Sequence, residues 1–182
     1  MSLSGGGWLP EARKLPSPNC DRRPPDTTID LLVIHNISLP PGEFGGPWID
    51  DLFLNRLDPA IDPYFREVAV LRVSAHLLIR RDGELIQYVD LNHRAWHAGA
   101  SSYAGRRACN DFSIGVELEG TDEAPYTERQ YCGLVHVTRT LQRLFPAITA
   151  ERIVGHSDIA PGRKTDPGLA FDWTGFRRRL AT

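Results

Sequence analysis

The sequence predicts the α/β class, a single domain in which helices pack on a mixed central β-sheet, and three observations lead to it. A continuous apolar run at 31–34 is typical of a central strand buried on both faces. Residues 81–83, Arg-Asp-Gly, lie between two extended segments and form a strong hairpin signal, which adds antiparallel pairing. Residues 127–145 carry apolar side chains at helical spacing, so the sheet has at least one helix to cover it.

Length and charge narrow the class of protein. The 182 residues suit one domain, 1–182, with a hydrophobic core and an irregular N-terminal segment at about 1–28. Lysine plus arginine number 21 and aspartate plus glutamate 23, and the resulting net charge of −2 argues against a nucleic-acid partner. No stretch approaches the roughly 18 apolar residues that a membrane helix needs, so we expect no membrane partner.

The N-terminus and the cysteines bear on localisation. The chain does not open with basic residues followed by an apolar stretch, which is the pattern of a secretory signal. Its three cysteines are scattered and form no Cys-x-x-Cys pair, which argues against a disulfide framework. We therefore expect a cytoplasmic protein, and we expect a monomer because nothing in the sequence indicates an obligate interface.

The first half of the chain gives one buried strand, a long aromatic segment and the hairpin. The strand is expected at Leu31–Ile34, with His35 at its end. Segment 38–65 is rich in proline, glycine and aromatic residues, which favours the structured wall of a binding cleft, with a short helix near 48–54. The hairpin then pairs extended segments at 73–80 and 84–90.

The second half alternates a clear strand with a clear helix. Residues 112–119 alternate between apolar and polar or small side chains, so the two kinds lie on opposite faces. The polar or small face is expected to hold Ser113, Gly115, Glu117 and Glu119. A capping box of Thr127 and Gln130 opens the helix, and Pro146 ends it. A strand at 152–154 and a helix at 172–180 complete the elements.

Two histidines and an aspartate suggest a metal site. His35 follows a strand, and active sites of open α/β sheets gather at the carboxyl ends of strands. His156 and Asp166 belong to one downstream segment, 156–168. Three protein ligands leave the fourth position of a tetrahedral zinc ion open, which is typical of a catalytic site. A lone histidine would more simply be buried and hydrogen-bonded, so the prediction depends on the combination.

A lysine next to the expected metal ligand could assist catalysis. Pro167 favours an extended backbone at Asp166, so Lys164 and Asp166 can point to the same side. A cation there would stabilise the oxyanion of a tetrahedral intermediate. The alternative is an ordinary surface lysine.

The strand at 112–119 offers a general base. Glu117 lies on its polar face beside Gly115, which would leave room for a ligand above the sheet. A carboxylate inside a strand is costly unless it is paired or faces a wet cleft, so Glu117 is expected to move the proton of the attacking water. Glu119 shares the face and is the competitor; Glu117 is preferred because it is more central.

The other histidines are expected to have supporting roles. His76 could support the metal ligands, and His136 is expected to be structural or exposed on its helix. His93 and His97 flank Trp96 in a loop of small residues, where the indole could stack on a sugar face or simply belong to the core.

Taken together, these stretches resemble the zinc-dependent N-acetylmuramoyl-L-alanine amidases of the type-2 family, which are related in fold to phage amidase lysozymes and peptidoglycan recognition proteins. The similarity is closest to cytoplasmic members that act on 1,6-anhydromuropeptides, and it covers about residues 7–176. The stretches that carry it are 32–46, Ser74-Ala75-His76, 94–99, 109–122 and 156–168.

The resemblance implies roles for individual residues. It implies zinc ligands at His35, His156 and Asp166, the general base at Glu117 and the oxyanion-stabilising cation at Lys164.

It also implies contacts with substrate. Asn36 and Trp96 would line the muramyl side of the cleft, and Arg72 would hold a carboxylate of the stem peptide. Where the family pattern has a second arginine this sequence has Ala108, so Arg106 or Arg107 is expected to take its place.

The expected function is hydrolysis of the amide between 1,6-anhydro-N-acetylmuramic acid and L-alanine, with zinc as cofactor and a small anhydromuropeptide as partner. The resemblance further implies cell-wall recycling and an influence on β-lactamase induction. Three alternatives stay open: an amidase of intact peptidoglycan, a non-catalytic peptidoglycan-binding module, and a generic α/β protein with incidental histidines.

Overall fold

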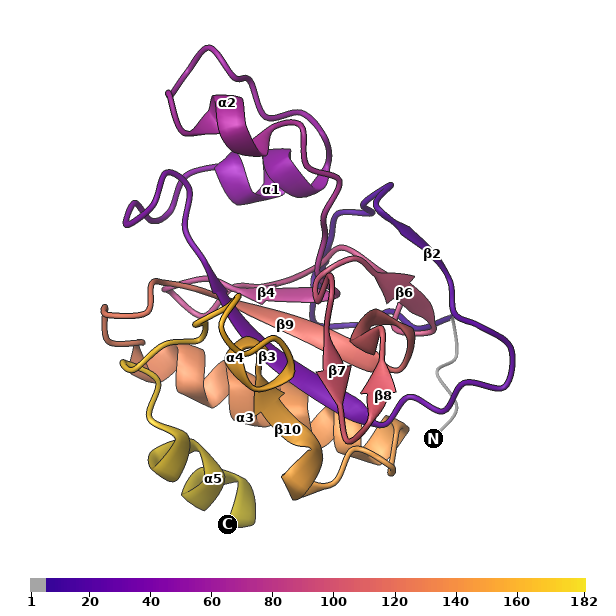
Figure 1. The fold of residues 1–182 in the computed structure, drawn as a ribbon. Helices are drawn as coiled ribbons and strands as arrows, with labels where there is room; N and C mark the ends of the chain where they lie inside the picture. The colour runs from indigo at the N-terminus through magenta and orange to yellow at the C-terminus, as the bar shows by residue number, and fades with distance from the viewer. Residues whose placement is uncertain (1–5) are drawn as a thin grey trace.

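The computed structural model describes residues 6–182 and confirms a single α/β domain built on a mixed sheet (Figure 1). Within these residues, six strands form the main sheet in the order β1-β5-β4-β9-β3-β10. Their bounds are Arg13–Lys14 (β1), Leu31–Ile37 (β3), Leu77–Ile79 (β4), Leu85–Gln87 (β5), Ser113–Glu119 (β9) and Ile153–Gly155 (β10). Strands β4 and β5 are antiparallel, and the other neighbours are parallel.

The remaining elements surround this sheet. The small strands are β2 (Cys20–Arg22), which pairs with β6 (His93–Ala95), and β7 (Ser102–Tyr103), which pairs with β8 (Arg106–Arg107). The helices are α1 (Trp48–Phe53), α2 (Phe65–Val68), α3 (Glu128–Leu144), α4 (His156–Ile159) and α5 (Trp173–Ala181), with 3-10 turns η1 (Cys109–Asp111) and η2 (Ala150–Arg152). None of the helices in the part of the chain described is long and apolar enough to cross a bilayer.

Several predicted boundaries differ from those observed. Strand β3 continues to Ile37, so the prediction that His35 ends the strand was wrong; parallel pairing with β9 persists through Ile37 and Glu119. Strands β4 and β5 are shorter than predicted because backbone groups on either side bond elsewhere; the amide of Ser74, for example, donates to the carbonyl of Trp96. The segment predicted to be irregular contains β1 and β2, and its residues 1–5 lie outside the described part.

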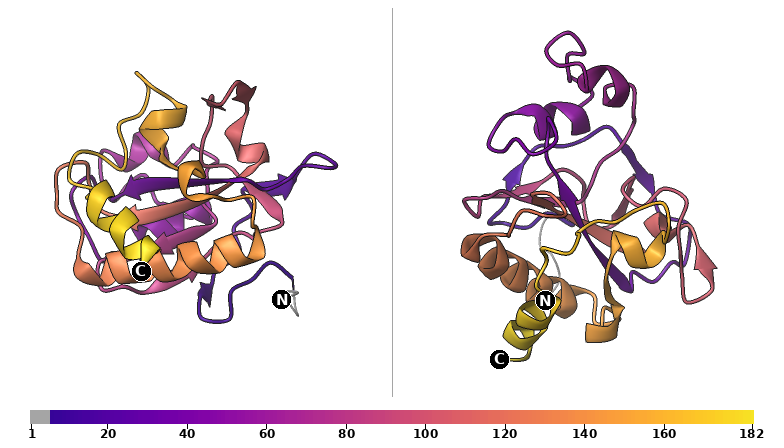
Figure 2. Two further views of the ribbon diagram at one scale, coloured as in Figure 1. Left: turned by 90° about the horizontal axis from the view of Figure 1, so that it is seen from below. Right: turned by 60° about the vertical axis from the view of Figure 1, so that its left-hand side comes forward.

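Helix α3 covers one face of the sheet, with α5 beside it (Figures 1 and 2). The predicted capping box is present, since Thr127 Oγ1 accepts from the amide of Gln130 and the Gln130 side chain accepts from the amide of Thr127. The helix buries Leu134, Val137 and Leu141 against apolar side chains of the strands, and each such side chain contributes about 1.5–3 kcal/mol. Local capping and periodic burial therefore fix this helix.

The other face of the sheet has two apolar clusters with a polar gap between them. One cluster includes Leu31 and Val33 at the start of β3, and the second lies beneath α1 and α2 and includes Phe53 and Phe65. Figure 1 shows α1 and α2 on the side of the sheet opposite α3. His35 lies between the clusters along β3, so the fold leaves a polar position at the centre of this face.

Candidate metal centre and its cleft

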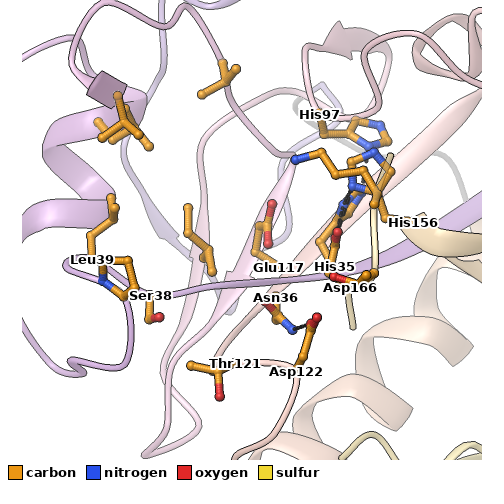
Figure 3. A pocket seen from close by; sticks show the side chains of 18 of the residues that line it. His35, Asn36, Ser38, Leu39, His97, Glu117, Thr121, Asp122, His156 and Asp166 are labelled. Carbon is orange, nitrogen blue, oxygen red and sulfur yellow. Dashed lines mark hydrogen bonds and ion pairs between the residues drawn. The ribbon is translucent and has the colours of Figure 1, made fainter. Parts of the chain in front are cut away.

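Three predicted ligands converge in the polar gap (Figure 3). His35 comes from β3, His156 is the first residue of α4, and Asp166 lies in the loop that follows α4. The Nδ1 atoms of the two histidines are 3.0 Å apart, and Asp166 Oδ2 lies 3.1 Å from His35 Nδ1 and 3.0 Å from His156 Nδ1. Strand β10 pairs with β3, which brings the segment from His156 onward next to His35 although the two are far apart in sequence.

The triangle of donor atoms fits a small tetrahedral cation. Ligands about 2.0 Å from a zinc ion at tetrahedral corners are roughly 3.3 Å apart, close to the edges found here. Two imidazole nitrogens and a carboxylate oxygen are also a common donor set for zinc. The arrangement is therefore a possible His-His-Asp metal site.

The second ring nitrogen of each histidine is engaged away from the triangle. His35 Nε2 lies 2.9 Å from Nδ1 of His97, and His156 Nε2 lies 3.2 Å from the carbonyl oxygen of Ala98. Metal-binding histidines characteristically hold their other nitrogen in this way, which orients the ring.

Surroundings shift the pKa values of two of these groups, His35 and Asp166. The pKa of His35 is lowered to about 4, chiefly because the ring is removed from water, with nearby Asp166 opposing the shift. Burial alone would raise the pKa of Asp166, but the close His156 and His35 rings bring it below its ordinary value. Neutral imidazole and ionised carboxylate are the forms that bind a metal ion.

Glu117 lies next to His35 on the neighbouring strand, as the register of β3 and β9 requires. Its side chain lines the same cavity, and its Oε2 is buried without a hydrogen-bond partner among the described residues. Burial raises the pKa of Glu117 well above its ordinary value; the charge of Asp166 adds to the shift and Lys164 opposes it. Such a carboxyl group is free to exchange a proton with a molecule in the cavity.

Glu119, the competitor, is committed to other contacts. Its Oε1 accepts from the amide of Gly45 at 2.6 Å and from Arg80 at 3.3 Å, and its Oε2 accepts from the amide of Arg81 at 3.0 Å. These contacts tie the loop before α1 to the sheet. Glu117 was preferred because it is more central in the strand. The contacts give a different reason for the same preference: Glu119 is already paired, whereas Glu117 has an oxygen without a partner among the described residues.

The ligands and Glu117 share one open cavity of about 630 Å³. Its far wall is apolar and comes largely from α1, α2 and their connections, including Leu52, Phe53 and Val68. Residues of segment 38–65 thus line the cavity, which confirms the prediction that this segment forms a cleft wall. Lys164 lines the cavity near Asp166 and is exposed, as a group that meets a ligand would be.

The predicted substrate contacts divide into two groups. Asn36 and Trp96 are half-buried and line the cavity, and Asn36 Nδ2 donates to Asp122 at 2.8 Å (Figure 3). Arg72 and Arg106 are exposed and are not among the residues that line it.

Each of these two arginines is engaged elsewhere. Arg72 donates to carbonyls of its own loop, at Ala69 and Leu71. Arg106 pairs with Asp30 at 2.8 Å and lies over the ring of Phe112. Their contact with substrate stays a prediction, and in this structure neither reaches the cleft.

Sequence reasoning missed the contacts of His97 and Asp122. His97 stood out only as a neighbour of Trp96, since nothing in the local pattern shows that its ring meets His35. Gly115 was expected to leave room for a ligand, but that expectation was wrong. A Cβ atom at Gly115 would lie 2.5 Å from Cγ of His97, so the space that the glycine leaves is filled by this ring.

Three metal-ligand atoms beside a buried carboxyl group suit a metal-dependent hydrolase, and sequence comparison gives the family. Residues 25–169 match the family model described as N-acetylmuramoyl-L-alanine amidase, and the chain belongs to this type-2 amidase family.

Individual relatives make the comparison more specific. The 1,6-anhydro-N-acetylmuramyl-L-alanine amidase AmpD of Escherichia coli (strain K12) is 64% identical over 171 residues, which cover 94% of this chain and 93% of AmpD. A crystal structure of a selenomethionine AmpD derivative aligns with a TM-score of 0.94 at 62% identity, covering 96% of this chain and 97% of that one. The E. coli amidase AmiD, in complex with anhydro-N-acetylmuramic acid-L-Ala-D-gamma-Glu-L-Lys, aligns with a TM-score of 0.62 at 28% identity, covering 87% and 60%.

Proposed function

We propose that the protein is a zinc-dependent amidase that cleaves the bond between the lactyl group of 1,6-anhydro-N-acetylmuramic acid and L-alanine. The observation that carries the proposal is the convergence of three ligand atoms beside a buried, unpartnered carboxyl oxygen in one cavity. The relatives support the substrate, since AmpD is named for this bond and AmiD is described with an anhydromuramyl peptide.

His35, His156 and Asp166 hold the metal, and zinc suits their donor atoms. When bound there, zinc would polarise the scissile carbonyl and lower the pKa of the attacking water to about 7. The family membership supports this cofactor.

Glu117 acts as the proton shuttle. It accepts the proton of the water as the water oxygen adds to the carbonyl carbon, and it delivers a proton to the alanine nitrogen as the carbon–nitrogen bond breaks. Burial raises the pKa of Glu117 above the ordinary carboxyl value, which strengthens it as a base toward the water, and the proton it takes is then available to the leaving nitrogen.

Lys164 stabilises the oxyanion of the tetrahedral intermediate. The residue lines the cavity on the side of Asp166, and its charge already opposes the shift in the pKa of Glu117. Electrostatic stabilisation of this kind acts only as negative charge develops, so it lowers the barrier rather than tightening substrate binding.

Substrate contacts follow from the lining of the cleft. Asn36 and Trp96 lie where they can meet the sugar side, since both line the cavity and Asn36 is held by Asp122. Arg72 and Arg106 would reach the stem-peptide carboxylates only by leaving their present contacts.

In the cell, we place the protein in the cytoplasm as a monomer that recycles cell-wall fragments. Removal of anhydromuropeptides would lower a signal for β-lactamase induction. The name of the AmpD relative supports the anhydromuropeptide substrate on which the recycling role depends.

The decisive experiment is hydrolysis of purified anhydromuramyl-tripeptide, followed by mass spectrometry with and without a chelator. Release of free tripeptide that chelation stops and added zinc restores is the expected result. No release by folded, zinc-loaded protein would favour a binding module. Release only from intact peptidoglycan would favour an amidase of the cell wall.

A further inference from the structure

In each of the two histidine ligands, Nε2 points away from the metal site. The two Nε2 atoms contact consecutive residues, His97 and Ala98. His35 Nε2 meets the ring of His97 at 2.9 Å, and His156 Nε2 meets the carbonyl of Ala98 at 3.2 Å. A carbonyl partner fixes which nitrogen of His156 carries the proton, because a carbonyl can only accept. A histidine partner does not, since a neutral imidazole can either donate or accept at Nδ1.

The contacts beyond His97 resolve that choice. Ser113 Oγ donates to the carbonyl of Cys109 at 2.6 Å, which uses the only proton of the hydroxyl. The Nε2 atom of His97, 3.1 Å from the same Oγ, must then carry a proton and donate it. Neutral His97 consequently has a lone pair at Nδ1, so His35 carries its proton on Nε2 and turns the lone pair of Nδ1 toward the space that it shares with Asp166 and His156.

The backbone around His97 is held equally firmly. The amides of His97 and Ala98 both donate to Oδ1 of Asn110, at 3.1 and 2.7 Å. On the other side of the ring, a Cβ atom at Gly115 would lie 2.6 Å from Nδ1, so only glycine on β9 admits the ring at this depth. Ser113 and Gly115 share the polar face of β9 with Glu117, and one strand therefore supplies the base and the support of a ligand.

We propose that His97 is a positioning residue, which through Ser113 and the Cys109 carbonyl fixes the tautomer and orientation of His35 for zinc. The inference rests on the proposed function, because it assigns a role toward the same metal site. His97 is not itself a fourth ligand, since both of its ring nitrogens are engaged with His35 and Ser113.

The expected effect is a loss of metal affinity. Removal of an outer partner of a metal-binding histidine lowers affinity about 10- to 100-fold. His97→Ala removes the acceptor, and His97→Asn restores an oxygen close to the place of Nδ1. Ser113→Ala keeps the ring of His97 but removes the group that dictates its tautomer. His136→Ala is the control, because His136 is exposed on α3, distant from the site.

Two readouts separate positioning from mere packing. The first is the zinc dissociation constant, measured for each variant by competition with a chromophoric chelator. The second is the nitrogen-15 spectrum of the histidine rings in the metal-free protein, which reports the protonated nitrogen of His35 directly. Neither readout depends on turnover.

The proposal expects a 10- to 100-fold weaker zinc affinity for His97→Ala, recovery to within a few-fold for His97→Asn, an unchanged control, and His35 protonated on Nε2. It is overturned if His97→Ala binds zinc like the parent, if His97→Asn restores nothing, or if His35 carries its proton on Nδ1. Should His97→Ala not fold, the parent spectrum and Ser113→Ala, expected to mix the two tautomers of His97, decide the matter. A parent protein that binds no zinc would remove the proposed function as well, whereas the other adverse outcomes remove only the role of His97.

Discussion

Substitution of Glu117 by glutamine should separate catalysis from stability. The change keeps the size of the side chain but removes both its charge and its ability to take a proton. Glu117 is only 8% exposed, and its Oε2 has no partner among the described residues. The same burial that suits the proposed base is therefore expected to destabilise the folded protein.

The catalytic effect follows from general acid–base catalysis, which contributes about 100- to 10,000-fold to rate. We expect kcat to fall within this range, while the affinity for zinc and for substrate changes little. The reason is that glutamine fills the same place beside His35 but cannot carry the proton from water to the leaving nitrogen.

Although Glu117→Gln should lower activity, it should raise the stability of the folded protein. Leaving a buried polar group unsatisfied costs about 1–3 kcal/mol, and more when it is charged. The metal-free variant should therefore unfold at a higher temperature than the parent at pH 8, by about 2–4 °C for each kcal/mol. Because the pKa of Glu117 is raised in the folded state, both folded and unfolded chains are protonated below about pH 4.5, and the difference should vanish there.

Glu119→Gln is the matched control, since it makes the same change two residues along the same strand. Glu119 accepts from Arg80 and from two backbone amides, so its loss of charge should lower stability, by about 1.5–3 kcal/mol for each charged hydrogen bond that weakens. Thermal unfolding and single-turnover hydrolysis measure the two effects. Unchanged turnover in Glu117→Gln, or destabilisation equal to that of Glu119→Gln, would refute the reasoning.

Three further predictions follow from the cleft. Lys164→Met should lower kcat about 100- to 1,000-fold with zinc affinity retained, whereas Lys14→Met, an exposed change on β1, should have no effect in the same assay. Removal of zinc should lower the free energy of unfolding by about 2.7 kcal/mol relative to protein in free zinc at 100 times its dissociation constant. Thermal unfolding with and without a chelator measures this, and an unchanged melting temperature would contradict it. His76 accepts from the amide of Gly115 at 3.0 Å and its pKa lies well below the ordinary value because it is buried. As pH falls below about 6.5 the unfolded chain alone binds this proton, so His76 contributes a loss of up to about 1.4 kcal/mol per pH unit in the metal-free protein. Because the pKa values of His35 and His97 are lowered as well, His76→Asn should reduce the pH dependence in denaturant titrations by this share and leave the rest.

The sequence predicted the elements whose stabilising contacts are local. The capping box of Thr127 and Gln130 and the apolar stripe that follows lie within one helix, so the pattern alone places α3. The alternation along β9 is also local, and it placed Glu117 on the polar face correctly. Boundaries were less certain where distant partners decide them, as in β3, which extends to Ile37 because β9 continues beside it.

The sequence could not tell which polar groups face the cleft and which are already paired. Glu117 and Glu119 lie on the same face of one strand, yet only Glu119 meets Arg80, the residue that follows β4. Arg106 looked free to bind substrate, but the folded chain brings Asp30 to it. These pairings join residues far apart in the chain, and no local pattern encodes them.

The sequence alone predicted the principal helix and singled out the proposed ligands and the proposed base, because residue chemistry and short-range periodicity can be read from it directly. The tertiary structure decided how those residues are held. His97 reaches His35 across the sheet only because β3 and β9 are neighbours and Gly115 leaves space for the ring. Orientation and burial arise from contacts between distant segments, and burial in turn sets the pKa values of Glu117 and His35.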